Sequence, residues 1–210
     1  MSLHYRAEVA CIFQKDGFAM QLSSSRSDRA AAPGSLEPAS VESHQPVVLG
    51  ERSLALMALV RIFFGLLWFQ QLAWKMPPTF GGLRRYVENE AQHTFVPGYS
   101  VILTNVFLAH FSLLGTGVWI AELLVAITLL FGIFTRFGAL LALLLSVQLY
   151  AGLAYAPGEW YWTYGMLVLL ALTLVAVPAG RRLGIDQLLL PRMQRAAQVS
   201  RLARLVCWFM

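Results

Sequence analysis

Five polar side chains lie inside long apolar stretches of the sequence. They are Arg61, Gln70, Gln71, Glu122 and Gln148. A charged side chain at the centre of a bilayer costs about 2.5 to 3.5 kcal/mol on insertion scales, so an arginine or a glutamate there needs a partner or water. A carboxylate that faces amides and an ammonium in an enclosed cavity can hold a proton or a small polar ligand. These residues are therefore the first candidates for chemistry.

Depth along a helix separates the two charged residues of this set. At about 1.5 Å of rise per residue, Arg61 lies roughly 10 Å from the inner end of its stretch, whereas Glu122 lies roughly 7 to 10 Å from the outer end of the next. This difference argues against an Arg61–Glu122 salt bridge, although a tilt or a shifted boundary would allow one. Arg61 is instead expected level with hydroxyl groups that could accept from its guanidinium, those of Thr128, Ser146 and Thr173.

The outer level brings Glu122 together with Gln70, Gln71, Lys75 and Tyr164. We interpret this group as a small-molecule or proton site. Its catalytic candidates are Glu122 and Arg61, and its cofactor-binding candidates are Gln70, Gln71, Lys75 and Tyr164. Two structural alternatives remain open: a buried hydrogen-bonded network at the outer level, and an Arg61 that ties helices together or reaches toward the inner headgroups.

The elements that must position these residues are apolar stretches long enough to cross a bilayer, which takes about 17 to 25 residues. Four such stretches occur, at residues 54–74, 115–134, 137–155 and 160–178. A shorter stretch at 101–114 predicts an interfacial or re-entrant helix, with a break after it at Gly115 and Gly117. The predicted fold class is all-α, an integral membrane four-helix bundle with this extra helix before the second span.

Composition supports a lipid environment. Hydrophobic residues make up 58% of the chain and charged residues only 13%, whereas soluble domains carry about 25% charged residues. An ordinary soluble enzyme is therefore excluded. We expect a disordered cytoplasmic tail at 1–52, the membrane domain at 53–190 and a basic amphipathic cytoplasmic tail at 191–210.

The distribution of arginine predicts the orientation. Residues 180–210 contain six arginines and one acidic residue, and arginines near span ends stay on the cytoplasmic side. An even number of spans then places both termini in the cytoplasm, in the inner membrane. The arginines are better explained by anionic lipid headgroups than by nucleic acid. The expected partners are the lipid bilayer and a protein subunit.

Metal and haem chemistry have no visible ligands. The two cysteines, Cys11 and Cys207, lie at opposite ends of the chain, and neither belongs to a CxxC pair. All four histidines fall outside the four apolar stretches, so a bis-histidine haem has no ligands there. No metal site is predicted, and no recognisable motif ligates a cofactor.

Short motifs follow one another in order along residues 59–189. They include Val60-Arg61-Ile62, Ala121-Glu122-Leu123-Leu124, Gly132-Ile133-Phe134-Thr135-Arg136 and Glu159-Trp160-Tyr161-Trp162. In their order and spacing the chain resembles the DoxX-like membrane proteins, and more closely the DoxD-type small subunit of thiosulfate:quinone oxidoreductase.

The resemblance implies a four-helix membrane protein that works with partner subunits and passes electrons from a sulfur compound to a quinone. It makes Arg61, Glu122 and Arg136 the polar positions typical of the family, and it implies contact between the Glu122 group and a quinone head or a proton. The alternative is a non-catalytic accessory or scaffolding subunit of a larger respiratory or photosynthetic membrane complex. Transport of a small solute has weaker support, because the sequence shows no internal repeat.

Overall fold

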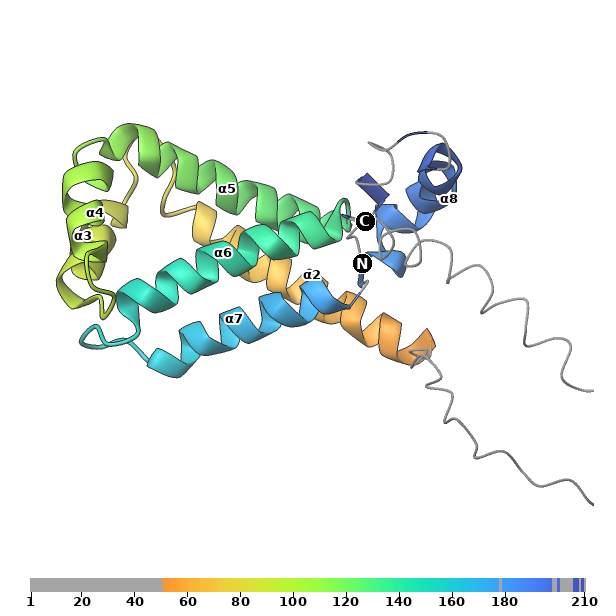
Figure 1. The fold of residues 1–210 in the computed structure, drawn as a ribbon, viewed down its shortest axis with the longest axis horizontal. Coiled ribbons are helices and arrows are strands. Elements are labelled where there is room, and N and C mark those ends of the chain that lie inside the picture. The colour runs from red at the N-terminus through yellow and green to blue at the C-terminus, as the bar shows by residue number, and fades with distance from the viewer. Residues whose placement is uncertain (1–50, 178, 198–199, 201–205, 208, 210) are drawn as a thin grey trace, which may run out of the picture. The chain divides into compact units, whose positions relative to one another are not determined.

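A computed structural model describes residues 51–177, 179–197, 200, 206–207 and 209 (Figure 1). Helices dominate these residues, and the part of the chain so described contains no strand. The all-α class is thereby confirmed. The predicted tail at 1–52 lies outside the described residues except for its last two, which begin the first long helix. Much of the predicted tail after residue 197 also lies outside them.

Three helices are long and apolar enough to cross a membrane. They are α2 (Glu51–Leu72), α5 (Phe111–Phe131) and α6 (Thr135–Leu153). Each follows one of the predicted stretches, with its ends shifted by a few residues. The last predicted stretch forms α7 (Tyr161–Ala176), an apolar helix of only 16 residues. The chain therefore has the helices of a multi-pass membrane protein.

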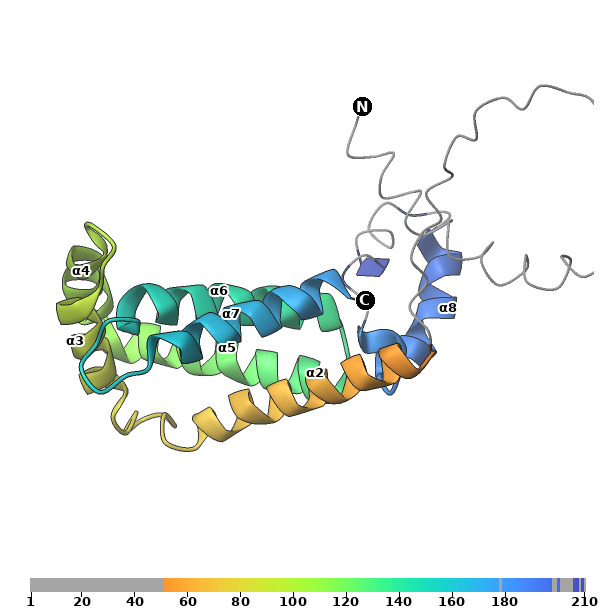
Figure 2. The ribbon, with the colours of Figure 1, turned by 90° about the horizontal axis from the view of Figure 1, so that it is seen from below.

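The four long helices lie side by side (Figures 1 and 2). Helix α2 packs on α5, α5 on α6 and α6 on α7, and α2 also touches α7. Fully buried alanines on α6 and α7 keep the backbones close, as small residues do between membrane helices. The core between the helices contains Phe64, Trp68, Val125, Ala126, Leu129, Ala139, Ala142, Ala171 and Leu174. Large apolar side chains cover the outward faces, as lipid contact requires.

A second layer covers one end of these helices, the end drawn at the left of Figure 1. We call it the cap layer: α3 (Leu83–His93), α4 (Tyr99–Ile102) and the π-helix η2 (Leu103–Phe107). Helix α3 packs against η2 and α6. Phe80, Leu83, Val87 and Leu103 form its small apolar core. We call this the cap end, and the opposite end, where η3 (Ala179–Arg181) and α8 (Ile185–Ala197) lie, the tail end.

The predicted helix at 101–114 is divided differently in the structure. Its first half belongs to α4 and η2, and its last residues begin α5, so the break falls near His110. The prediction of a break at Gly115 and Gly117 was wrong, because α5 runs through both. Gly115 is buried in α5, where an added Cβ would lie 3.4 Å from the Phe80 ring. This glycine is needed for close packing beneath the cap layer rather than for a turn.

Candidate functional site

A cavity of about 250 Å³ lies between the cap layer and the helices α5 and α6. Its walls are mostly apolar, with side chains such as Leu103, Leu145 and Leu149. Polar groups enter it from several elements: Lys75, Tyr86, Glu90, Tyr99, Glu122 and Gln148. An apolar pocket into which a few polar groups converge is the usual form of a small-molecule site.

Lys75 and Glu122 form a buried ion pair in this cavity. The Lys75 Nζ lies 2.5 Å from Glu122 Oε1, and the two residues are only 6% and 2% exposed. The ammonium also lies 4.9 Å from the centre of the Trp74 ring, within range of a cation–π interaction. The other carboxylate oxygen, Glu122 Oε2, is buried and has no hydrogen-bond partner among the described residues. A buried acceptor without a partner is costly, so this atom is suited to a donor supplied by a ligand or water.

Glu90 is a second buried carboxyl group in the same cavity. It accepts a hydrogen bond of 2.6 Å from Gln148 Nε2. Burial raises the pKa of Glu90 from 4.5 to about 8, although the charge of Lys75 and the hydrogen bond from Gln148 act in the opposite direction. The carboxyl group therefore carries a proton near neutral pH. Gly152 makes room for it, because an added Cβ would lie 2.8 Å from Glu90 Cγ.

The position of Glu90 follows from the pattern of α3. Leu83, Val87 and Glu90 are spaced by four and three residues, so they share one face of the helix, and this is the buried face. Glu90 is not among the candidates taken from the sequence, because its segment lies between the apolar stretches. The signal that could have found it is the helical spacing of the two apolar residues, which predicts that the residue three positions later is also buried.

We take the side of the cavity at Ile102 and Val106 as its mouth, because these two lining residues are 56% and 51% exposed. This side is apolar. Both residues belong to the short helices of the cap layer, next to the apolar surface of the long helices. A ligand that reaches the cavity by this side passes apolar side chains, which suits an amphiphile dissolved in the bilayer.

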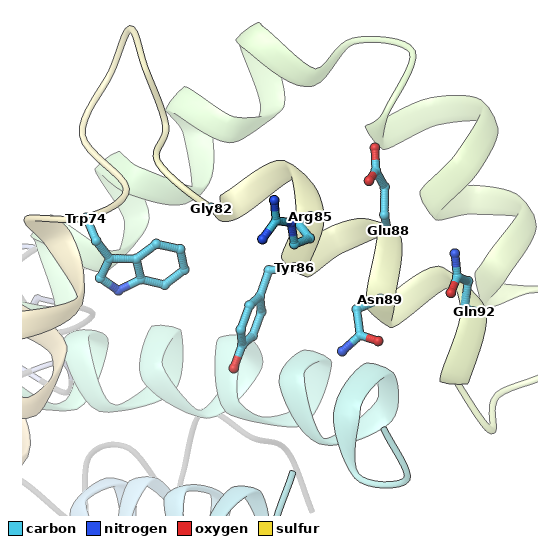
Figure 3. Close-up of a pocket in the computed structure, with 7 residues that line it drawn as sticks. All are labelled: Trp74, Gly82, Arg85, Tyr86, Glu88, Asn89 and Gln92. Carbon is cyan, nitrogen blue, oxygen red and sulfur yellow. The ribbon is translucent and has the colours of Figure 1, made fainter. Parts of the chain in front are cut away.

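A separate hollow of about 620 Å³ lies on the outer side of α3 (Figure 3). Trp74, Gly82, Arg85, Tyr86, Glu88, Asn89 and Gln92 line it. Tyr86 belongs to both this hollow and the inner cavity, and its ring lies 5.8 Å from that of Trp74. Tyr86 is therefore part of the wall between the two spaces.

The structure places the predicted site residues other than Arg61 in three groups. Glu122 and Lys75 meet in the cavity, and Gln148 joins them there. Gln70 and Gln71 are exposed and do not line the cavity; Gln71 Oε1 accepts from Trp74 Nε1 at 2.8 Å. Tyr164 is buried beside the cavity, where it hydrogen-bonds with Tyr86 and Glu159. Depth alone grouped these residues, whereas their directions around each helix separate them.

Arg61 lies at the tail end and does not contact Glu122. It is fully buried, and its Nη2 donates to the Leu183 carbonyl oxygen at 2.8 Å. Its Nε and Nη1 have no hydrogen-bond partner within the described residues. None of the predicted hydroxyl groups accepts from Arg61. The Ser146 hydroxyl has no hydrogen-bond partner among the described residues, and those of Thr128 and Thr173 donate to carbonyl groups of their own helices. An added Cβ at Gly132 or Gly184 would overlap the guanidinium, so the backbone packs directly against it.

Asp186 completes the cluster around Arg61. Its carboxylate accepts from the backbone N–H groups of Phe134 and Thr135, at 2.8 and 3.0 Å, and from the Thr135 hydroxyl at 2.8 Å. These donors are at the start of α6, where the first backbone N–H groups lack partners within the helix. Asp186 therefore caps α6 and fixes the chain segment that follows α7.

No protein-family model, curated protein or solved structure matches the chain. Among the described residues, no three His, Cys, Asp or Glu side chains lie close enough together to hold a metal ion. Function must therefore be inferred from the chemistry of the cavity and of its mouth.

Proposed function

We propose that this chain is a four-span, DoxX/DoxD-like subunit of a membrane redox complex, and that its cavity receives the head group of a quinone. The observation that carries the proposal is Glu122. Its Oε1 is paired with Lys75, while its Oε2 is left without a partner in an apolar cavity. The apolar mouth at Ile102 and Val106 suits a lipid-soluble ligand.

The cavity offers the hydrogen-bonding groups that a quinone needs. Lys75 and Gln148 are placed to donate to a carbonyl oxygen, and Glu122 Oε2 to accept from a ring hydroxyl. A quinone takes up two electrons and two protons when it is reduced. Glu90 holds a proton near neutral pH and lines the same cavity, so it is suited to supply one. The electrons would come from a partner subunit.

The proposed topology places α2, α5, α6 and α7 across the bilayer with both termini in the cytoplasm. This topology is supported by α7, which is apolar and packs along α6 as the fourth helix of the group. Trp160, Tyr161 and Trp162 are exposed at the start of α7, as expected of an interfacial aromatic belt. The cap end then faces outward, away from the arginine-rich tail. Protease treatment of sealed vesicles tests this topology, and termini on opposite faces would contradict it.

Quinone binding can be measured on the purified protein. The full chain is prepared in mild detergent, and its organic extract is analysed for quinone. A short-chain ubiquinone is then titrated against the wild type, Glu122→Gln and Glu88→Gln. Glu88 is the control because it is an exposed glutamate paired with Arg84. We expect Glu122→Gln to weaken binding about tenfold, because it removes a charged hydrogen-bond acceptor, and Glu88→Gln to bind as the wild type does. Equal affinity in all three proteins would remove Glu122 from the site.

The second candidate is a non-catalytic accessory or scaffolding subunit of a larger membrane complex. It is favoured by the Arg61–Asp186 cluster, whose contacts fix segments of the chain together at the tail end. In that case the Lys75–Glu122 pair would have the same role at the other end. A stoichiometric protein partner together with an extract free of quinone, and no binding in the titration, would favour this function over the first.

A further inference from the structure

Three polar side chains from three elements meet beside the cavity. Tyr86 comes from α3, Glu159 from the turn between α6 and α7, and Tyr164 from the first turn of α7. Both phenols donate to the carboxylate: Tyr86 to Glu159 Oε1 at 3.1 Å, and Tyr164 to Oε2 at 2.8 Å. The two phenol oxygens lie 3.3 Å apart. The three groups therefore form one connected hydrogen-bonded cluster.

The cluster extends from the surface to the cavity. Glu159 is half-buried in a turn whose neighbours Gly158 and Trp160 are exposed. Tyr164 is buried, and Tyr86 lines the cavity itself. Glu90 lies on α3 one turn after Tyr86 and lines the same cavity. Because the cavity measures about 250 Å³ and a water takes about 30 Å³ of liquid volume, it has room for several waters.

Tyr86 keeps its proton under ordinary conditions. Burial raises the pKa of Tyr86, and the negative charges of Glu159 and Glu90 raise it further, while the hydrogen bond with Tyr164 acts in the opposite direction. A phenol that stays protonated acts as both donor and acceptor. It can therefore accept one proton while it releases its own, and it returns to the neutral form.

We propose that Glu159, Tyr164 and Tyr86 conduct protons between the aqueous phase at the cap end and Glu90 in the cavity. This inference rests on the proposed function, because it supplies the protons that quinone reduction consumes. A proton from water binds a Glu159 oxygen. It then passes to a phenol oxygen as that phenol releases its own proton onward, and a cavity water carries the proton to a Glu90 oxygen. Each O–H bond that breaks is replaced by the next one formed, and no electrons move.

The same contacts also hold α3 against the α6–α7 turn, so the test needs variants that keep the packing. Glu159→Gln retains an acceptor for one phenol and loses the titratable group. Tyr86→Phe retains the ring, its contact with Trp74 and the bulk of the wall. Glu88→Gln is the matched control, because Glu88 is a glutamate of the same helix as Tyr86 but is exposed and outside the cluster.

The experiment follows the protonation of Glu90 after a rapid pH jump, with the full chain in lipid nanodiscs. The signal is the infrared band of the protonated carboxyl group, assigned as the band that Glu90→Gln removes. We expect Glu159→Gln and Tyr86→Phe to slow this protonation at least about tenfold, in line with the contribution of a positioned proton-transfer group. Added formic acid, a small proton carrier, should restore the rate in Glu159→Gln. Glu88→Gln should behave as the wild type.

The outcomes separate this inference from the proposed function. Wild-type rates in both Glu159→Gln and Tyr86→Phe would overturn the proton path, as would equal slowing in Glu88→Gln. If Glu159→Gln does not fold, Tyr86→Phe alone decides. The band and its kinetics need no quinone, so the path can be established even when the organic extract contains none. In the same way, quinone binding with unchanged proton kinetics would leave the proposed function intact and remove the path.

Discussion

The two ends of the helical layer both contain a buried cation near a buried carboxylate, yet they differ in what surrounds them. At the tail end, three donors from the start of α6 fill the Asp186 carboxylate, and glycine backbone packs against the Arg61 guanidinium. At the cap end, Glu122 meets Lys75 through one oxygen only, its other oxygen has no partner among the described residues, and the residue lines a cavity.

The difference separates a structural role from a functional one. The Asp186 carboxylate accepts from three donors of the chain, so it holds segments together and offers little capacity for a ligand. A buried charge with an open acceptor, room beside it and an apolar entrance has that capacity. Arg61 was a catalytic candidate from sequence, and its surroundings favour the structural alternative.

The largest effect is expected at the tail end. Asp186→Ala removes the acceptor of two backbone N–H groups and of the Thr135 hydroxyl, and with it the negative charge that acts on Arg61. Removing the charged partner of a buried ion costs about 3 to 5 kcal/mol. The measurement is thermal unfolding in detergent. Gln187→Ala, at the exposed neighbouring position, should change the unfolding free energy by less than about 0.5 kcal/mol. Similar losses in both variants would contradict the role given to Asp186.

At the cap end, removing the cation should weaken both folding and ligand binding. Lys75→Met leaves Glu122 as a buried charge without its partner. We expect the affinity for a short-chain ubiquinone to fall about tenfold to a hundredfold. The double variant Lys75→Met/Glu122→Gln removes the unpaired charge, so it should regain stability but not affinity. Wild-type affinity in the double variant would show that the pair is only structural.

The pKa of Glu90 predicts a pH-dependent stability. The pKa rises from 4.5 to about 8 on folding, so the folded protein binds more protons than the unfolded chain between these values. The contribution of Glu90 to the free energy of unfolding should therefore be highest below pH 4.5 and fall as the pH rises toward 8. The slope is at most about 1.4 kcal/mol for each pH unit.

The check is the unfolding midpoint measured across this pH range in detergent. Glu90→Gln should flatten the fall, whereas Glu88→Gln should keep it. An unchanged slope in Glu90→Gln would assign the titration to another group.

The smallest effect is expected from a single methyl group. In Gly152→Ala the new Cβ would press on the Glu90 side chain and shift it away from Gln148. Overpacking of this kind costs about 1 to 3 kcal/mol, and the displaced carboxyl should weaken ligand binding severalfold. Gly117→Ala is the control, because nothing lies within 4 Å of its added Cβ. Equal effects in both would show that Glu90 has room to move.

The fold could be predicted in outline because apolar stretches of bilayer length are visible in any sequence. The approximate positions of the helices and the different depths of Arg61 and Glu122 follow from counting residues along these stretches. The direction in which a side chain points around the helix axis cannot be predicted in this way, because lipid-facing and core-facing side chains are equally apolar. Gln70 and Gln71 were therefore placed at the right level but on the wrong side of α2.

Other features depend on contacts between distant segments. Glu90 enters the cavity only because α3 folds back across the end of the helices, and Asp186 finds Thr135 only after α7 has returned the chain to the tail end. The sequence does not encode these pairings as local motifs. Lys75 and Glu122 could be grouped in advance because both lie near the same end of adjacent long helices.

The length of α7 bears on where such a protein would reside. Its 16 residues rise about 24 Å at 1.5 Å each, which is less than the roughly 30 Å of a typical hydrocarbon core. In the proposed arrangement, lipid beside this helix must compress or the flanking tryptophans must sink toward the acyl chains, and both deform the membrane. Bilayers with shorter acyl chains would relieve that strain, so they should retain the protein preferentially.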